Sequence, residues 1–282
     1  MRCLSPVILC CLTAGLHGQQ TISVPIIVAS GDHASISVKE ADLKAEVNHQ
    51  PVAIASVTPL AGKHLQYVLL NDQSGSTRWP DGIKQQTEVA DQLLKQVVAA
   101  GSDIGSLVNF GDDVFIDVQN EKDPLKLAGK LERTGRGGTK LYDAVVSAGK
   151  WLAKQPVNPD HRKVMFLFCD GEDNTSKSRL SEAIDTLQRA TIPIFIIAPS
   201  SVETKKQGVK LRQLSRETGG RVYFLPRDTK QVEFALLKQD LSQSFLLKMS
   251  IPSGEGTLPL VITDPANPQD QISAPSQIVA PQ

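Results

Sequence analysis

The feature that most constrains the fold is a regular alternation of short apolar runs and amphipathic stretches from Ala61 to Leu225. The run from Leu65 to Leu70 is apolar apart from Gln66, as expected of a strand that is covered on both faces. Residues 82–100 then place apolar side chains at helical spacing, which predicts an amphipathic helix. Repeated alternation of this kind predicts an α/β fold with a doubly wound, mostly parallel sheet and helices on both faces.

Further apolar runs and helical stripes continue this series along the chain. Strands are predicted at 104–110, 114–118, 164–169, 192–198 and 222–225, and helices after Thr139, from Leu180 to Leu187, and across about 205–218 and 229–243. Gly111-Asp112-Asp113 joins the first two of these strands as a hairpin-type turn. One antiparallel strand is therefore expected, at an edge of the sheet.

The segments on either side of this block have a different pattern. Residues 21–60 are rich in Val, Ile and Ser without a helical stripe, and residues 245–282 contain short apolar runs followed by several prolines. Both patterns predict β-strands, which we expect to pair as a small β module beside the α/β domain. A disordered tail over the last residues is the alternative. The expected division is a signal peptide at 1–18, a β segment at 19–60, the α/β domain at 61–245, and a β segment with a Pro-rich tail at 246–282.

The N-terminus has the pattern of an export signal. Met1-Arg2 supplies a positive end, Cys3 to Leu16 is an almost unbroken apolar run, and Gly18 is a small residue before a polar start. Because the apolar run is too short to span a bilayer, we expect a cleaved signal peptide and no transmembrane span in the mature chain. A buried first helix is the alternative. The mature protein is expected to be secreted, or periplasmic at the cell envelope.

The charge balance argues against binding to nucleic acid or to an anionic membrane, and the cysteine content argues against an internal disulfide. The chain has 30 basic and 30 acidic residues, and loss of residues 1–18 would remove only Arg2 from this balance. No basic cluster indicates binding to nucleic acid or to an anionic membrane surface. Of the four cysteines, only Cys169 would remain after cleavage. Stability therefore has to come from a packed core, because one cysteine cannot form an internal disulfide.

Polar residues follow two of the predicted strands, at the edge where parallel sheets bind ligands. Asp72, Ser74 and Ser76 follow the first strand at alternate positions, so in an extended loop their oxygens point the same way. Asp170 follows a later strand. Thr139 comes between them in sequence, at the end of a glycine-rich loop that leads into a helix.

These two carboxylates and three hydroxyls form an all-oxygen set without histidine or cysteine. Hard cations prefer such ligands, whereas zinc prefers nitrogen or sulfur. Five protein groups, some of them acting through water, leave a position for an external acidic ligand. We therefore predict a divalent-cation site, for Mg²⁺ in the first place with Mn²⁺ and Ca²⁺ as alternatives, at Asp72, Ser74, Ser76, Thr139 and Asp170. The alternative is that Asp72 and Ser74 only cap a helix or stabilise a turn.

The order of these residues resembles the metal-ion-dependent adhesion site of von Willebrand factor type A domains. The residues that carry the resemblance are Asp72-Gln73-Ser74-Gly75-Ser76, Gly138-Thr139 leading into Leu141-Tyr142-Asp143-Ala144, and Asp170-Gly171, and the resemblance extends over about 61–245. Asn71 and Thr77 depart from the family pattern at positions that are not ligands.

The resemblance implies specific roles for the five residues. Ser74, Ser76 and Thr139 would touch the metal, and Asp72 and Asp170 would hold it directly or through bound water. An aspartate or glutamate of a protein or peptide partner would complete the coordination.

The flanks are also similar to a bacterial branch of secreted von Willebrand factor A-like proteins, described especially from acidobacteria. This similarity covers Val38 to Val57 and Thr218-Gly219-Gly220.

Three functions are compatible with this set of residues. The first is a metal-dependent protein-binding or adhesion module. The second is a metal-assisted hydrolase, since Mg²⁺ with aspartate ligands also suits phosphate chemistry. The third is a scaffold whose metal only stabilises the fold. The sequence shows no nucleophile paired with a base and no phosphate-cradling loop, and Cys169 is expected to be a buried, inert thiol. We therefore expect a binding module and no enzyme.

Overall fold

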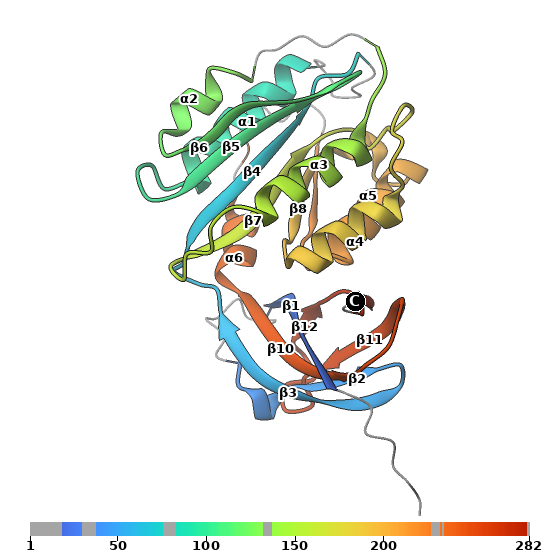
Figure 1. Cartoon of the computed structure of the whole chain (residues 1–282). Helices are drawn as coiled ribbons and strands as arrows, with labels where there is room; N and C mark the ends of the chain where they lie inside the picture. The colour runs from blue at the N-terminus through green and yellow to red at the C-terminus, as the bar shows by residue number, and fades with distance from the viewer. Residues whose placement is uncertain are drawn as a thin grey trace, which may run out of the picture.

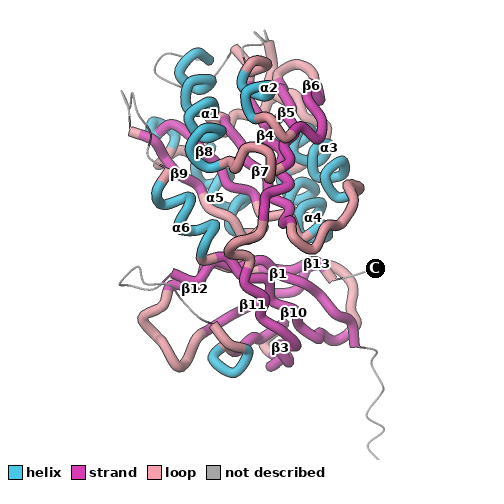
Figure 2. The backbone as a smooth tube through the Cα atoms, turned by 90° about the vertical axis from the view of Figure 1, so that its left-hand side faces the viewer, coloured by secondary structure: helices cyan, strands magenta, loops and turns pink. Residues whose placement is uncertain are grey.

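A computed structural model describes residues 19–29, 38–75, 83–131, 137–226, 232 and 234–280. These residues form two β-sheets. A six-stranded mixed sheet is flanked by helices, and a seven-stranded antiparallel sheet lies below it in Figures 1 and 2. The two sheets come from different parts of the chain, because the middle of the sequence forms the first sheet and both flanks combine to form the second.

The six-stranded sheet has the order β6-β5-β4-β7-β8-β9. Its strands are β4 (His64–Asp72), β5 (Ile104–Phe110), β6 (Val114–Glu121), β7 (His161–Phe168), β8 (Ile194–Pro199) and β9 (Val222–Leu225). All neighbours are parallel except β5 and β6, which pair antiparallel at one edge. The mostly parallel sheet and its single antiparallel edge strand agree with the sequence-based prediction.

Helices cover both faces of this sheet. The helices are α1 (Ile83–Val97), α2 (Pro124–Ala128), α3 (Leu141–Ala153), α4 (Leu180–Ala190), α5 (Lys206–Arg216) and α6 (Ala235–Ser242), with short 3₁₀ turns at Glu40–Asp42 and Ser200–Val202. Side chains of α3, α4 and α5 belong to one core, and those of α1, α2 and α6 to the other. The sequence pattern did not predict α2, whose five residues are too few for a helical stripe.

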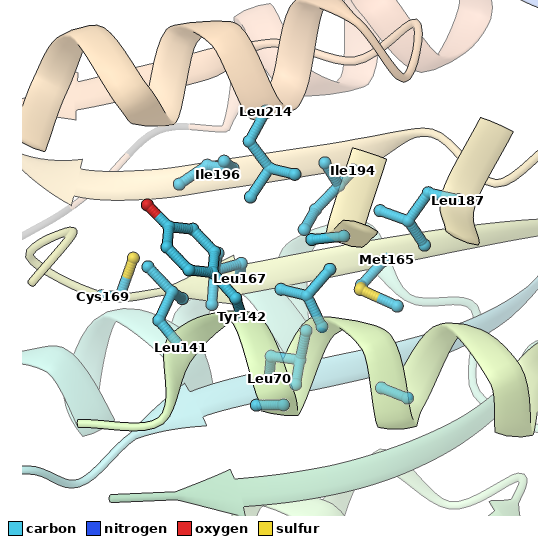
Figure 3. Close-up of a cluster of buried hydrophobic side chains, with 14 of the residues drawn as sticks. Leu70, Leu141, Tyr142, Met165, Leu167, Cys169, Leu187, Ile194, Ile196 and Leu214 are labelled. Atoms are coloured by element: carbon cyan, nitrogen blue, oxygen red, sulfur yellow. The ribbon is translucent and has the colours of Figure 1, made fainter. Parts of the chain in front are cut away.

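The apolar run of β4 supplies both cores at once. Val68 and Leu70 point to the core under α3, whereas Tyr67 and Leu69 point to the core under α1. Successive side chains of a strand face opposite sides, so a strand covered on both faces has to be apolar throughout. Figure 3 shows the first of these cores, with Leu70 among side chains from β7, β8 and the surrounding helices.

The seven-stranded sheet has the order β12-β1-β10-β3-β2-β11-β13. Its strands are β1 (Gln19–Ala29), β2 (Lys44–Val47), β3 (Gln50–Pro59), β10 (Ser244–Pro252), β11 (Thr257–Thr263), β12 (Gln271–Ser273) and β13 (Gln277–Val279). The two flanks do pair with each other, as predicted, but the prediction of a small module was wrong. The sheet is large because strands of the N-terminal flank lie between strands of the C-terminal flank, which local patterns do not reveal.

Strand β1 connects the two sheets, because its side chains pack into a core of each. It pairs with β10 from Gln19 opposite Pro252 to Ile27 opposite Ser244. Ile27 packs into the core beneath α1, while its neighbour Ile26 packs into the core of the antiparallel sheet. Gly219, at φ +80°, lies against the backbone of β1, and a Cβ at this position would collide with the carbonyl of Pro25. Only glycine fits this crossing without strain.

A second connection between the sheets is made by Glu217, which follows α5. Glu217 is 5% exposed, and its carboxylate accepts hydrogen bonds from Ser276 N at 2.9 Å, Ser276 Oγ at 2.7 Å and Gln277 N at 3.1 Å. Gln188 of α4 donates to the Gln277 carbonyl at 2.8 Å and accepts from Val279 N at 3.1 Å. Ser276 and β13 are thereby held against α4 and the end of α5.

None of the described helices is long and apolar enough to cross a membrane. The predicted signal peptide, residues 1–18, lies outside the described residues.

Candidate metal centre

The carboxyl ends of β4 and β7 bring Asp72 and Asp170 to the same edge of the sheet. The two strands are parallel neighbours with Asn71 opposite Phe168, and parallel strands lie about 4.8 Å apart. Asp72 is the last residue of β4, and Asp170 follows the end of β7 by two residues. Both residues are 0% exposed. Two acidic side chains are therefore buried close together.

One oxygen of each carboxylate fixes its own loop. Asp72 Oδ1 accepts a hydrogen bond from Ser74 N at 2.9 Å, and Asp170 Oδ1 accepts one from Glu172 N at 3.0 Å. Bonds of this kind to the residue two positions on are typical of Asp at turns. Asp72 thus makes the turn-stabilising contact that the alternative interpretation predicted. Its other oxygen, Oδ2, is buried and has no hydrogen-bond partner among the described residues.

The electrostatic surroundings of Asp72 disfavour a free negative charge. Burial raises the pKa of Asp72 from 3.8 to about 7. Hydrogen bonds from Ser74 oppose this shift, whereas the negative charges of Asp170 and Glu172 increase it. A buried carboxylate without a compensating partner is costly, and a cation bound beside it removes that cost. The arrangement therefore favours a bound cation.

Ser74 lies on the same loop as Asp72, Thr139 reaches the region on a third loop, and both are 0% exposed. Thr139 N donates to Asn174 Oδ1 at 2.7 Å, and the Thr139 carbonyl accepts from Asn174 N at 3.1 Å. These bonds hold Thr139 against the segment that follows Asp170. Gly111 lies between the loop that carries Ser74 and the loop that carries Gly138. A Cβ at Gly111 would be 3.7 Å from Ser74 N and 3.8 Å from the Gly138 carbonyl oxygen.

The described residues thus include four members of the predicted ligand set, Asp72, Ser74, Thr139 and Asp170, on loops that meet at one edge of the sheet. Ser76 lies outside the described residues. Within the described parts of the chain, no group of three or more His, Cys, Asp or Glu side chains is arranged to hold a metal. The predicted set is of another type, with two carboxylates and otherwise hydroxyls.

The hairpin turn between β5 and β6 holds the glycine-rich loop, a role that sequence reasoning missed. Asp112 Oδ1 accepts a hydrogen bond from Gly138 N at 2.5 Å. Gly137 has φ +105°, and a Cβ on it would collide with the Asp112 carboxylate. Lys140 N donates to the Gly111 carbonyl at 3.0 Å. The paired glycines before Thr139 were the available signal, since they allow this close approach.

A buried amide network behind the site was also missed. Gln86 of α1 is 0% exposed, and its Nε2 donates to Asn71 Oδ1 at 2.9 Å, to the Asp72 carbonyl at 2.6 Å and to the Phe168 carbonyl at 3.3 Å. Asn71 and Gln73 both donate to Asn109 Oδ1 at 2.9 Å. Gln86 therefore ties the ends of β4 and β7 together, and Asn71 has a structural reason to differ from an apolar residue.

The acidic residues next to the site have structural roles. Asp173 Oδ1 accepts hydrogen bonds from Ser176 Oγ at 2.5 Å and from Tyr142 N at 3.4 Å. Asp143, in the first turn of α3, accepts from Lys177 N at 3.0 Å and from Ser178 N at 2.8 Å. These contacts attach the loop after β7 to the start of α3.

Cys169 is fully buried beside this edge. Burial raises the pKa of its thiol well above the ordinary value, and the neighbouring charges of Asp72 and Asp170 act in the same direction. Figure 3 shows the sulfur among apolar side chains near Tyr142. Because the reactive form of cysteine is the thiolate, this protonated thiol is poorly suited to be a nucleophile.

Comparison with known proteins supports a family for the central part of the chain. Residues 67–172 match the family model of the von Willebrand factor type A domain. This interval contains Asp72, Ser74, Ser76, Thr139 and Asp170. The horse (Equus caballus) protein calcium-activated chloride channel regulator 1 is 29% identical over 157 residues, which cover 54% of this chain. The match spans only 16% of the length of that relative.

The chain is also similar to two solved structures. Proximal thread matrix protein 1 from the mussel byssus, solved with a zinc-occupied MIDAS motif, is 17% identical with a TM-score of 0.48, covering 64% of this chain and 48% of that one. BatB from Bacteroides thetaiotaomicron is 13% identical with a TM-score of 0.49, covering 64% and 97%. It is the family match at residues 67–172 that supports a von Willebrand factor type A domain in this chain.

Proposed function

We propose that this chain is an exported, metal-ion-dependent binding module. It holds one divalent cation, Mg²⁺ in the first place and Mn²⁺ or Ca²⁺ as alternatives, and binds an Asp or Glu carboxylate of a protein or peptide partner. The observation that carries the proposal is the buried Asp72 Oδ2, which has no hydrogen-bond partner among the described residues and lies beside a second buried carboxylate. A divalent cation would pair with Asp72 Oδ2 and balance the negative charge of the two carboxylates.

The donor chemistry fits such an ion. The proposed ligands are Asp72, Ser74, Ser76, Thr139 and Asp170, with the aspartates acting directly or through bound water. Two carboxylates balance a dication, and neutral hydroxyls add no further charge, so the ion keeps an affinity for one more anionic oxygen. The bound ion would supply an electrophilic centre for a partner carboxylate. Asn174, Gln86 and Asp112 hold the loops of this set in place.

Export and the closer family relationship are parts of the same proposal. Cleavage after residue 18 would release the protein to the outside of the cell or to the periplasm at the cell envelope. There a von Willebrand factor type A domain would meet partner proteins. The likeness of the flanks to secreted bacterial relatives of acidobacterial type is, like export, a prediction from the sequence.

The metal part of the proposal is tested by calorimetric titration of the purified protein with Mg²⁺ alone. The parent is expected to bind one ion, and Asp72→Ala and Thr139→Ala are expected to lose this binding while remaining folded. Asp160→Ala and Thr257→Ala are matched controls, because both residues are exposed and lie outside the metal-binding loops. An Asp72→Ala variant that binds Mg²⁺ as tightly as the parent would show that the ligand assignment is wrong.

The partner part is tested with immobilised peptides that display glutamate, against the same peptides with glutamine. The parent is expected to bind only the glutamate peptides, and only with Mg²⁺ present, since chelation removes the bridge between protein and carboxylate. Binding that is equal in Mg²⁺ and in EDTA would exclude the adhesion function. Magnesium binding without any carboxylate binding would instead indicate a structural metal, and phosphoester turnover that depends on Asp72 would indicate a hydrolase.

A further inference from the structure

A cavity of about 470 Å³ lies between the two sheets, away from the metal-binding loops. It is lined from above by the amino-terminal ends of the parallel strands, including His161 and Arg162 at the start of β7, and by Ala190 at the end of α4. From below it is lined by Pro25 of β1 and Leu246 of β10. Figure 1 shows the six-stranded sheet and its helices above β1 and β10 of the antiparallel sheet.

The charged side chains of the cavity lining are all basic. Lys63, His161, Arg162, Lys163 and Arg189 all line it, whereas the described lining residues include no Asp or Glu. A concave site with charges of one sign and walls of low dielectric concentrates the electric field and attracts ions of the opposite sign. The composition of the lining therefore selects for an anion.

Within the described parts of the chain, three of these cations form no ion pair. Lys63 Nζ donates to the Pro159 carbonyl at 2.8 Å, Lys163 Nζ to the Gln155 carbonyl at 2.8 Å, and Arg162 Nη1 to the Leu241 carbonyl at 2.7 Å. Hydrogen bonds to carbonyls orient the cations but do not cancel their charge.

Arg162 is the most buried of these groups. Its Nε is closed off from solvent without a hydrogen-bond partner among the described residues. Asp103 attracts the guanidinium, but the two oxygens of that carboxylate already accept Leu65 N and Ala99 N, each at 2.7 Å. A buried, incompletely compensated cation is costly to the fold, and an anion in the cavity would reduce that cost.

Most of the remaining lining is apolar and comes from both sheets, and its neutral polar members are Gln66, Asn158, Thr191 and Ser244. The larger apolar members are Ile26, Leu60, Val164, Phe195 and Leu246. Cavities of about 300–1,000 Å³ with mostly apolar walls and a few convergent polar groups are typical sites for small organic molecules. Apolar walls together with these cations suit a ligand that carries an anionic group on an apolar body.

We propose that this cavity binds a small amphipathic anion, with its charged group near Arg162 and Lys63 and its apolar body between β1, β10 and the end of α4. Such a ligand would contact both sheets simultaneously. Its binding would therefore stabilise the packing of the six-stranded sheet and its helices on the antiparallel sheet. A ligand that binds only the folded state adds its binding free energy to the stability of the protein.

The test uses decanoate as the anionic probe and decanol as its neutral counterpart, in calorimetric titrations of the whole chain. All titrations are done in EDTA, because a carboxylate is also the group expected at the metal centre. The parent is expected to bind decanoate saturably at one site and decanol at least tenfold more weakly. Equal binding of decanoate and decanol, or no saturable binding of decanoate, would overturn the proposal.

Three variants locate the site. Arg162→Gln and Lys63→Gln are each expected to weaken decanoate binding about tenfold by removing a cation. Ala190→Phe is expected to abolish it by filling the cavity. Lys154→Gln is the matched control, since this exposed lysine follows α3 nearby but does not line the cavity. Lys63 lies on a connecting loop, so Lys63→Gln still decides the result if a core variant does not fold. Unchanged affinity in Lys63→Gln and in every folded core variant would refute the assignment.

Discussion

Replacement of Asp72 by asparagine separates the cost of its buried charge from its role in metal binding. In the absence of metal, Asp72 is 0% exposed, its Oδ2 has no partner among the described residues, and its pKa is raised from 3.8 to about 7. Asparagine keeps the oxygen that accepts Ser74 N but carries no charge. The variant is therefore expected to be more stable than the parent without metal, and unable to respond to it.

The size of this effect follows from the pKa shift. A group whose pKa is raised on folding contributes stability that is complete below its unfolded value of 3.8 and is lost as the pH rises through about 7. A shift of about three pKa units corresponds to about 4 kcal/mol at pH 8. Against this, the buried amide N–H₂ of asparagine lacks a partner and costs about 1–3 kcal/mol. The net gain for Asp72→Asn at pH 8 is therefore about 1–3 kcal/mol.

Thermal unfolding at pH 8, in EDTA and in Mg²⁺, measures both consequences. A domain of this size changes its Tm by about 2–4 °C per kcal/mol, so the variant in EDTA is expected to melt several degrees above the parent. Mg²⁺ at about a hundred times its dissociation constant adds about 2.7 kcal/mol to the parent and nothing to the variant. Asp160→Asn, at an exposed loop position, should match the parent in both buffers.

Two results would refute this reasoning. If Asp72→Asn were less stable than the parent in EDTA at pH 8, the cost of the buried charge would be smaller than the cost of the unpaired amide. If the variant gained as much stability from Mg²⁺ as the parent does, Asp72 would not be a ligand.

Four other predictions concern the surroundings of the site and the contact between the sheets. The affinity of the parent for Mg²⁺ should fall as the pH is lowered through about 7, because Asp72 has to lose its proton to bind the ion, and a pH-independent affinity in titration calorimetry would contradict this. Gln86→Leu removes three buried hydrogen bonds and should cost about 1–3 kcal/mol in urea unfolding and also weaken Mg²⁺ binding. Glu217→Ala should cost a similar amount and speed amide hydrogen exchange at 276–279, whereas unchanged exchange there would dismiss this contact. Gly219→Ala should cost more than about 1 kcal/mol, because the added methyl meets the backbone of β1 at a positive φ, and an unchanged midpoint in urea would disprove it.

Whether a part of the fold could be predicted from the sequence depended on how far apart its contacting residues lie along the chain. The strands and helices of the central sheet were predictable because their signals are local, as in the unbroken apolar run of β4. Helix α2 was missed because it is too short to show a helical period. The size of the second sheet was underestimated because β1 pairs with β10, more than two hundred residues later in the sequence. Pairing over such a distance leaves no periodic trace in either strand.

The candidate site divides in the same way. The residue types of Asp72, Ser74, Thr139 and Asp170, together with their positions after predicted strands, were sufficient to propose an oxygen-rich cation site. The groups that hold these residues in place were not foreseen. Gln86 reaches the site from α1, and Asp112 reaches it from a hairpin that looked like a simple turn.

The sequence by itself therefore determined the alternation of strands and helices, the apolar faces and the chemistry of the predicted ligands. All of these depend on the identity and spacing of neighbouring residues. The tertiary structure decided which buried oxygen of Asp72 lacks a partner among the described residues, which amide ties β4 to β7, and how the flanks help to form a basic cavity beneath the central sheet. These properties arise only when distant segments come into contact, because burial and unpaired charge are produced by packing and not by any single segment.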